Sequence, residues 1–153
     1  MTAAGSTDAP RLPWDNPRFR NWIAVVRAER AVVRELAKAI APLKIGQLDV
    51  LMNLYRHPGL SQHDLARRLL VGRSNITMLL PQLESQGLLR RDPDESDRRV
   101  LRLYLTEEGE TRLMAAMEIY VALLDRVMAQ STPDQCERLG DQMRRISEAL
   151  KED

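Results

Sequence analysis

The sequence predicts a mainly α-helical fold of six helices, with one small β-hairpin between the fourth and fifth. Apolar residues recur at helical spacing in six separate stretches. Between residues 88 and 105, two short segments of strand type flank a densely charged turn. Aromatic residues make up only 4% of the chain, so we expect an aliphatic core. The 153 residues are enough for one such core.

The first three helices are predicted from apolar periodicity and local breaks. A long amphipathic helix fills residues 18–42 and ends at Pro42, because proline disfavours helical geometry in the residue before it. A second helix fits residues 47–56, with its apolar residues Leu48, Leu51, Met52 and Tyr55 expected to point inward. After the break "HPG" at 57–59, Ser61 stands three residues before Asp64, a spacing typical of a capping box at a helix start.

A fourth helix is predicted from near Gly72 to about Gln86, with Gly87 as its C-cap. Pro81 lies inside this helix and removes one hydrogen bond, so we expect a kink or a loosening that costs about 3 kcal/mol if uncompensated. Residues 88–92 and 99–105 are predicted strands, and the charged segment between them is the hairpin loop.

Two further helices follow the hairpin. Thr106 precedes a run of acids, and Thr132 precedes Pro133, so each threonine is a predicted N-cap. The apolar positions of the last helix follow a 3-4-3-4 spacing that predicts a packing seam. Those positions are Cys136, Leu139, Met143, Ile146 and Leu150. The small central unit covers only part of the long helices, so we expect a second copy of the chain to cover the rest.

The net charge is only +1, but the charges are unevenly distributed. Residues 1–60 carry nine lysines and arginines against five acids, residues 61–105 eight against six, and residues 106–153 six against eleven. A polyanion should therefore meet the first two thirds of the chain. No apolar run approaches the ~20 residues of a membrane span, and the first residues lack a secretory signal pattern. We expect a cytoplasmic protein, in keeping with its single cysteine.

Two helices joined by a short turn and followed by a hairpin indicate a winged helix-turn-helix. The second helix of such a pair lies in the major groove of DNA, while the wing reaches the adjacent backbone or minor groove. Here that helix presents Arg73, Ser74, Asn75 and Thr77 at its N-terminal end. These residue types reach base edges and phosphates, and a helix N-terminus favours phosphate.

The stretches "SQHDLARRL", "SNITMLLPQLESQGLLRR" and "DESDRRVLRLYLTEEG" resemble the MarR family of bacterial transcription regulators. The resemblance is strongest over about residues 43–113, and the flanking helices match in length and order. The family is dimeric, binds pseudo-palindromic operators and often releases DNA when a small anionic or aromatic ligand binds. The resemblance implies a homodimeric repressor of this kind, released by such a ligand, for example an aromatic acid or its CoA thioester.

The resemblance also assigns roles to residues. Ser74 and Thr77 fall where the family contacts bases and phosphates, flanked by Arg73 and Asn75. Asp97 and Arg99 fall on the D-x-R pair of the wing, where the arginine enters the minor groove and the aspartate holds its guanidinium. The expected DNA-binding set also includes Ser61, Gln62 and Arg98. The chain departs from the family pattern at Lys44, Gly72, Met78 and Pro81.

The implied organisation is a flexible tail at 1–17, dimerisation helices at 18–42 and 107–153, and a DNA-binding domain at 43–106. The arginines that repeat on the first helix fit either a solvated face or the border of a ligand cleft. In the second interpretation apolar side chains line the rest of the cleft. The same side chains would also be explained by packing in the core. The candidate ligand-binding residues are Trp22, Arg27, Arg30, Arg34, Met52, Tyr55 and Met117.

No catalytic, metal or cofactor site is predicted. "SQHD" at 61–64 contains the residue types of a catalytic triad, but neighbours in one helical turn point in different directions. The two histidines follow no zinc-binding spacing. Cys136 is expected to be buried and structural rather than a redox sensor, since acids flank it. The alternative function is a winged-helix module that binds a protein and no DNA, which a gel shift would distinguish.

Overall fold

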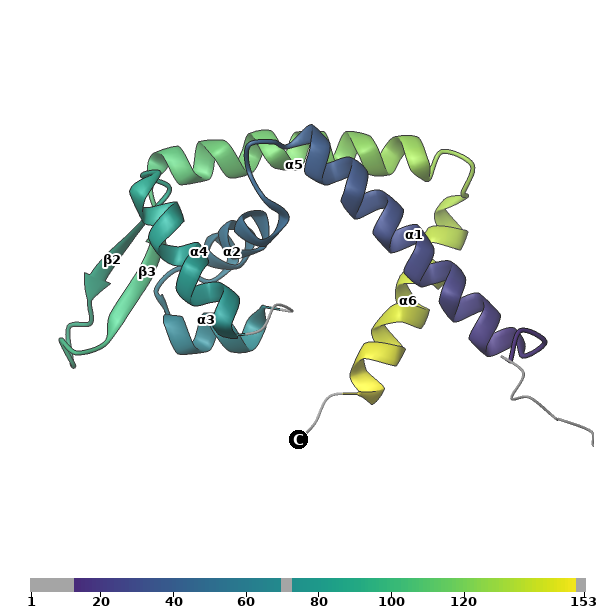
Figure 1. Ribbon diagram of the computed structural model, residues 1–153, viewed down its shortest axis with the longest axis horizontal. Coiled ribbons are helices and arrows are strands. Elements are labelled where there is room, and N and C mark those ends of the chain that lie inside the picture. The colour runs from purple at the N-terminus through teal and green to yellow at the C-terminus, as the bar shows by residue number, and fades with distance from the viewer. Residues whose placement is uncertain (1–12, 70–72, 151–153) are drawn as a thin grey trace, which may run out of the picture.

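The computed structural model describes residues 13–69 and 73–150, which form six helices and a three-stranded antiparallel sheet. This confirms the predicted fold class. Figure 1 shows the long helix α5 along one edge, with α2–α4 and the sheet near its N-terminal part and α1 and α6 near its C-terminal part. The helices are α1 (Pro17–Ala39), α2 (Ile45–Arg56), α3 (Gln62–Arg68), α4 (Arg73–Ser85), α5 (Glu107–Val127) and α6 (Pro133–Ala149).

The strands are β1 (Leu60–Ser61), β2 (Leu89–Pro93) and β3 (Leu101–Leu105), in the order β1-β3-β2. The hairpin of β2 and β3 was predicted, but β1 was not, because a strand of two residues leaves no periodic pattern. Leu60 pairs with Leu103 and Ser61 with Arg102. The start of α3 is therefore held directly against the hairpin.

The core is aliphatic, as predicted. The largest fully buried side chains come from α2, α3, α4, the sheet and α5, with one polar residue, Gln47, among them. These residues are Leu51, Leu54, Leu65, Ile76, Leu80, Leu83, Leu103, Leu113, Gln47 and Val50. The expectation that Tyr55 points inward was wrong, since it is 48% exposed while Val50 takes the buried position.

Side-chain caps begin three helices where the sequence predicts them. Ser61 Oγ accepts from the Asp64 amide at 3.1 Å, Thr106 Oγ1 from the Gly109 amide at 3.0 Å, and Thr132 Oγ1 from the Gln135 amide at 3.3 Å. Each bond satisfies an amide that the first helical turn leaves without a partner.

The helix α2 begins without a cap from Lys44, whose side chain has no acceptor atom. Instead the buried Gln47 accepts from the Lys44 amide at 3.0 Å and lies 3.5 Å from the Gln86 side chain. One side chain thereby ties the start of α2 to the end of α4.

Pro81 does not interrupt α4, which continues as one helix to Ser85. The loosening predicted at Pro81 therefore does not break the helix. Pro81 lies on the exposed side, whereas Leu80 and Leu83 are buried in the core. Packing of that apolar side holds the helix together, although the Thr77 carbonyl still loses its helical partner.

The terminal helices leave apolar residues uncovered within one chain. The helix α6 buries none of its residues, and Leu139 and Leu150 of its seam are 45% and 78% exposed. The expectation of a buried Cys136 was wrong at the level of one chain, because this residue is only half-buried. On α5, Val121, Leu124 and Val127 are exposed as well. Among the described helices, none is long and apolar enough to cross a membrane.

Gly109 permits a close contact between the start of α5 and the turn that precedes β2. A Cβ atom added to Gly109 would overlap the Leu88 carbonyl oxygen. Thr106 binds the same turn, since its hydroxyl donates to the Gly87 carbonyl at 2.5 Å and its amide to the Leu88 carbonyl at 3.2 Å. The hairpin and α5 are therefore joined by backbone contact.

We expect Gly109→Ala to lower the free energy of unfolding by roughly 1–3 kcal/mol, because a backbone shift must relieve the overlap with Leu88. The matched control is Gly140→Ala in α6, where the added Cβ meets only the flexible Arg144 side chain, at 3.2 Å. Alanine should favour that helix by about 1 kcal/mol. Urea unfolding at one fixed protein concentration measures both, and equal effects of the two substitutions would contradict the close contact.

Candidate nucleic-acid interface

The exposed loop between β2 and β3, residues 94–100, carries an arginine held by an aspartate. Arg99 Nε and Nη2 donate to the two carboxylate oxygens of Asp97 at 3.0 and 3.1 Å, and the Arg99 amide donates to the same carboxylate at 3.1 Å. The Arg99 side chain is 91% exposed. The pairing expected from the sequence is present, and it presents the guanidinium to solvent in a defined orientation.

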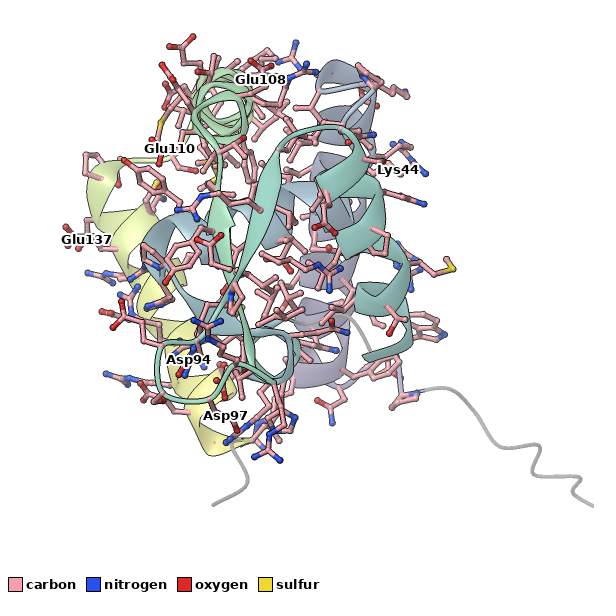
Figure 2. All side chains as sticks on the ribbon, turned by 90° about the vertical axis from the view of Figure 1, so that its left-hand side faces the viewer. Lys44, Asp94, Asp97, Glu108, Glu110 and Glu137 are labelled. Carbon is pink, nitrogen blue, oxygen red and sulfur yellow. The ribbon has the colours of Figure 1, made fainter. Side chains whose placement is uncertain are left out.

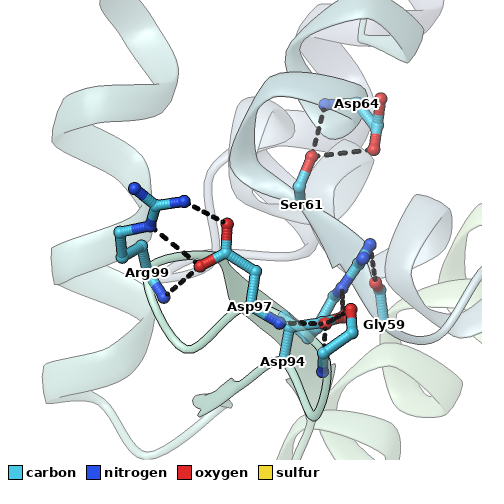
Figure 3. A network of polar contacts seen from close by, with 8 residues as sticks. Gly59, Ser61, Asp64, Asp94, Asp97 and Arg99 are labelled. Atoms are coloured by element: carbon cyan, nitrogen blue, oxygen red, sulfur yellow. Dashed lines mark hydrogen bonds and ion pairs between the residues drawn. The ribbon is translucent and has the colours of Figure 1, made fainter.

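A second aspartate organises the loop from inside, as Figure 3 shows. The Asp94 carboxylate accepts from the Ser96 amide at 2.9 Å, the Ser96 hydroxyl at 2.5 Å and the Asp97 amide at 3.1 Å. Arg102 Nε donates to its other oxygen at 2.6 Å. Sequence reasoning missed Asp94 and Arg102, because a charged turn does not reveal which acid faces inward.

The electrostatics of the two aspartates follow from these contacts. Hydrogen bonds from Ser96, and then from Arg102, hold the pKa of Asp94 well below its ordinary value. The Arg99 side chain is the main cause that lowers the pKa of Asp97, and Asp97 in turn raises the pKa of Arg99. Both carboxylates are therefore charged at neutral pH, so they act as acceptors for the arginines and amides around them.

The start of α3 lies beside the hairpin. Ser61 Oγ donates to Asp64 Oδ2 at 2.7 Å, and this bond is the main cause that lowers the pKa of Asp64. The interpretation of "SQHD" as a helix cap is confirmed. Ser61 is half-buried, while Gln62 and His63 are exposed. The exposed Gln62 side chain is therefore accessible to a ligand.

The helix α4 is described in part. The side chains of Arg73, Ser74 and Asn75, and the whole of Gly72, lie outside the described residues. Thr77 and Met78 are exposed on the first two turns, Met78 to 65%, while Ile76 is buried.

The sides of the hairpin carry further arginines that are paired within the chain. Arg90 forms an ion pair with Asp92, and its guanidinium lies 4.7 Å from the centre of the Tyr104 ring. Arg91 Nε donates to Glu84 of α4 at 3.0 Å. Figure 2 shows Asp94 and Asp97 at the end of the molecule away from Glu108 and Glu110. The acids at the start of α5 are therefore remote from the exposed loop.

The candidate ligand-binding residues lie on three helices. The α1 residues Trp22, Arg27, Arg30 and Arg34 are exposed. Met52 of α2 and Met117 of α5 are partly buried against the core, which favours a packing role for both. Tyr55 lies at the exposed end of α2. Their assignment to a ligand stays a prediction.

A groove of about 600 Å³ lies between α1 and α5 and contains none of these candidates. Its floor is apolar and its rim is charged. The lining residues are Glu35, Lys38, Ala39, Ile119, Ala122, Leu123 and Arg126. Lys38 donates to Glu35 at 3.0 Å. Within the described ranges, no three His, Cys, Asp or Glu side chains gather in a way that would hold a metal ion.

Comparisons with known proteins agree on one family. The family model described as "MarR family" matches residues 43–101. The HTH-type transcriptional repressor MdtR of Bacillus subtilis (strain 168) is 28% identical over 107 residues, which cover 70% of this chain and 69% of MdtR.

Two solved structures are similar over most of the chain. The transcriptional repressor CouR, bound to a 23-mer DNA duplex, is 32% identical with a TM-score of 0.73, covering 81% of this chain and 89% of CouR. The organohalide-sensing regulator RdhR-CbdbA1625, bound to 2,4-dichlorophenol, has a TM-score of 0.78 and covers 97% of this chain and 90% of its own. At 16% identity this second likeness is one of fold.

We expect Arg99→Ala to raise the pKa of Asp97 towards the ordinary aspartate value of about 3.9 and to leave that of Asp94 low. The Arg99 side chain is the main cause of the low pKa of Asp97, whereas it is not among the causes of the low pKa of Asp94. A lowered carboxyl pKa stabilises the loop at neutral pH, and that contribution is lost as pH falls through the folded-state value. Carboxyl ¹³C titration by NMR measures both groups, and an unchanged pKa of Asp97 would contradict the pairing.

Proposed function

Because this chain belongs to the MarR family of DNA-binding, winged-helix transcription regulators, we propose that it represses transcription by binding a pseudo-palindromic operator as a homodimer. We further propose that a small anionic or aromatic ligand releases it. MdtR and CouR are both named as repressors, which supports this sign of regulation. Regulators of this family are not enzymes, and no catalytic role is proposed for this chain.

The observation that carries the DNA-binding proposal is the oriented, solvent-exposed Arg99 on the loop between β2 and β3. Strand β3, which follows this loop, forms backbone pairs with β1, directly before α3. Arg99 enters the minor groove, while α4 lies in the major groove. Thr77 and the N-terminal residues Arg73, Ser74 and Asn75 of α4 contact bases and phosphates. Ser61, Gln62 and Arg98 contact the backbone beside them.

The proposed dimer joins two chains through α1, α5 and α6. Its support is the apolar surface that one chain leaves uncovered on all three helices. A stable dimer buries roughly 800 Å² of surface per partner. Three long helices together can supply an area of this size. The exposed large apolar residues of these three helices are Trp22, Met114, Ile119, Val121, Leu124, Val127, Leu139 and Leu150.

The proposed effector is an aromatic acid or its CoA thioester. A pocket for such a ligand needs an apolar floor and a cation at the rim, and the groove between α1 and α5 offers both. Arg126 is the proposed cation, since Lys38 at the same rim already donates to Glu35. An effector that binds the folded protein raises its thermal midpoint and lowers its operator affinity in the same experiment. A ligand that does only the first is not the effector.

We expect Arg99→Ala to weaken binding to the DNA upstream of the chain's own gene by ~1–3 kcal/mol, because one minor-groove arginine is lost. The slope of log affinity against log salt should flatten by about 0.9 if that contact is also a phosphate contact. A gel shift with excess nonspecific competitor, repeated at several salt concentrations, measures both.

The matched control is Arg112→Ala, which removes a charge of the same sign from the exposed side of α5, where Arg112 pairs with Glu108. Figure 2 shows Glu108 at the end of the molecule away from Asp97. It should bind the operator like the wild type. Equal affinities of both variants and the wild type would rule out the role of Arg99. A wild type that forms no competitor-resistant complex would favour the alternative, a winged-helix module that binds another protein.

We expect Leu139→Glu to convert the dimer into monomers, because a carboxylate would enter the apolar surface of α6. Since Leu139 is exposed within one chain, the monomer should still fold. Arg145→Gln makes the same change in net charge at an exposed position on the other side of α6 and should remain dimeric. Light scattering after gel filtration gives the mass, and a dimeric Leu139→Glu would contradict this interface.

A further inference from the structure

We propose that Asp94 and Arg102 are positioning residues for DNA binding, which set where the wing presents Arg99 relative to α3 and α4. This inference rests on the proposed function and adds two residues that touch no DNA. The geometry points to them because together they connect the loop to the backbone before α3 through a short series of contacts (Figure 3).

Arg102 forms the inner end of this series. It lies on β3 between both neighbouring strands, paired with Asp92 of β2 and with Ser61 of β1. Its Nη1 lies 3.4 Å from the Gly59 carbonyl oxygen, and the Gly59 amide donates to the Leu103 carbonyl at 2.9 Å. The segment that leads into α3 therefore helps to hold the guanidinium of Arg102 in position.

Asp94 forms the outer end. One oxygen accepts from Arg102, and the other accepts three bonds from Ser96 and Asp97. The Asp94 amide also donates to the Val100 carbonyl at 2.8 Å, which closes the loop at its base. A single carboxylate thus determines the backbone position of Asp97, and the Asp97 carboxylate holds Arg99.

Burial separates this pair from the other charges of the loop. The side chains of Asp94 and Arg102 are 16% and 35% exposed, whereas Asp97 and Arg99 are 41% and 91% exposed. An ion pair shielded from solvent keeps its geometry better than an exposed one, because water and salt screen it less. The inner pair is thus suited to orientation and the outer pair to contact with a polyanion.

A double-mutant cycle on operator affinity tests the proposal. We expect Asp94→Asn to weaken binding to the upstream duplex roughly threefold to thirtyfold, which lies within the range of coupling between residues in one network. In an Arg99→Ala background the same substitution should have almost no effect, because it acts through Arg99. A loss of folding would weaken binding in both backgrounds alike, so the cycle separates positioning from stability.

The matched control is Glu95→Gln, which removes the same charge from the exposed neighbouring position of the loop and should leave affinity within about twofold in keeping with a solvated surface charge. If Asp94→Asn does not fold, Arg102→Lys takes its place: it keeps the charge but loses the fork that reaches both Asp94 and Gly59. It should show the same dependence on Arg99.

Three outcomes overturn the inference. Asp94→Asn and Glu95→Gln have equal effects, or Asp94→Asn weakens the wild type and Arg99→Ala by the same factor, or Arg102→Lys binds like the wild type. In these cases the wild type still binds the operator and the proposed function stands. A wild type that binds no upstream duplex overturns the proposed function, and the inference falls with it.

Discussion

The pairing of β3 with strands on both sides is the constraint on which the rest of the structure depends. β3 joins β2 to form the wing and joins β1 to hold the segment that begins α3. At its end, Thr106 and Gly109 fix α5 against the turn before β2. One strand of five residues therefore sets the wing, the helix pair and the long helix relative to one another. A protein that must place two elements on a duplex at once needs such a rigid link.

The charged loop between the strands is an ordered arrangement rather than a merely soluble turn. Its acids divide into one that faces inward to organise the backbone and one that faces outward to hold an arginine. These two different roles of the acids explain why "DPDESDRR" carries both charges. An arginine cluster without the acids would repel itself and leave the guanidinium groups unoriented, whereas the acids cost little because the loop is exposed.

The sequence predicted the elements well because their signals are local. Caps at Ser61, Thr106 and Thr132 and the apolar side of α4 depend on residues within one or two turns of each other. The failures are of a different kind. The strand β1 and the exposure of Tyr55 depend on how segments far apart in the chain pack together. The inward side of Asp94 depends on Arg102 of the neighbouring strand β3. Pro81 broke a local rule, yet tertiary packing of Leu80 and Leu83 kept the helix whole.

In the proposed function the chain is one half of a symmetric homodimer, in which the uncovered terminal helices bring two wings and two α4 helices to one side of a DNA duplex. Hydroxyl-radical footprinting of the upstream DNA with the wild-type protein tests this most directly. Two equivalent protected blocks, with centres about one helical turn or 10–10.5 base pairs apart, are the predicted result. A single block, or protection without a repeat, would contradict the account.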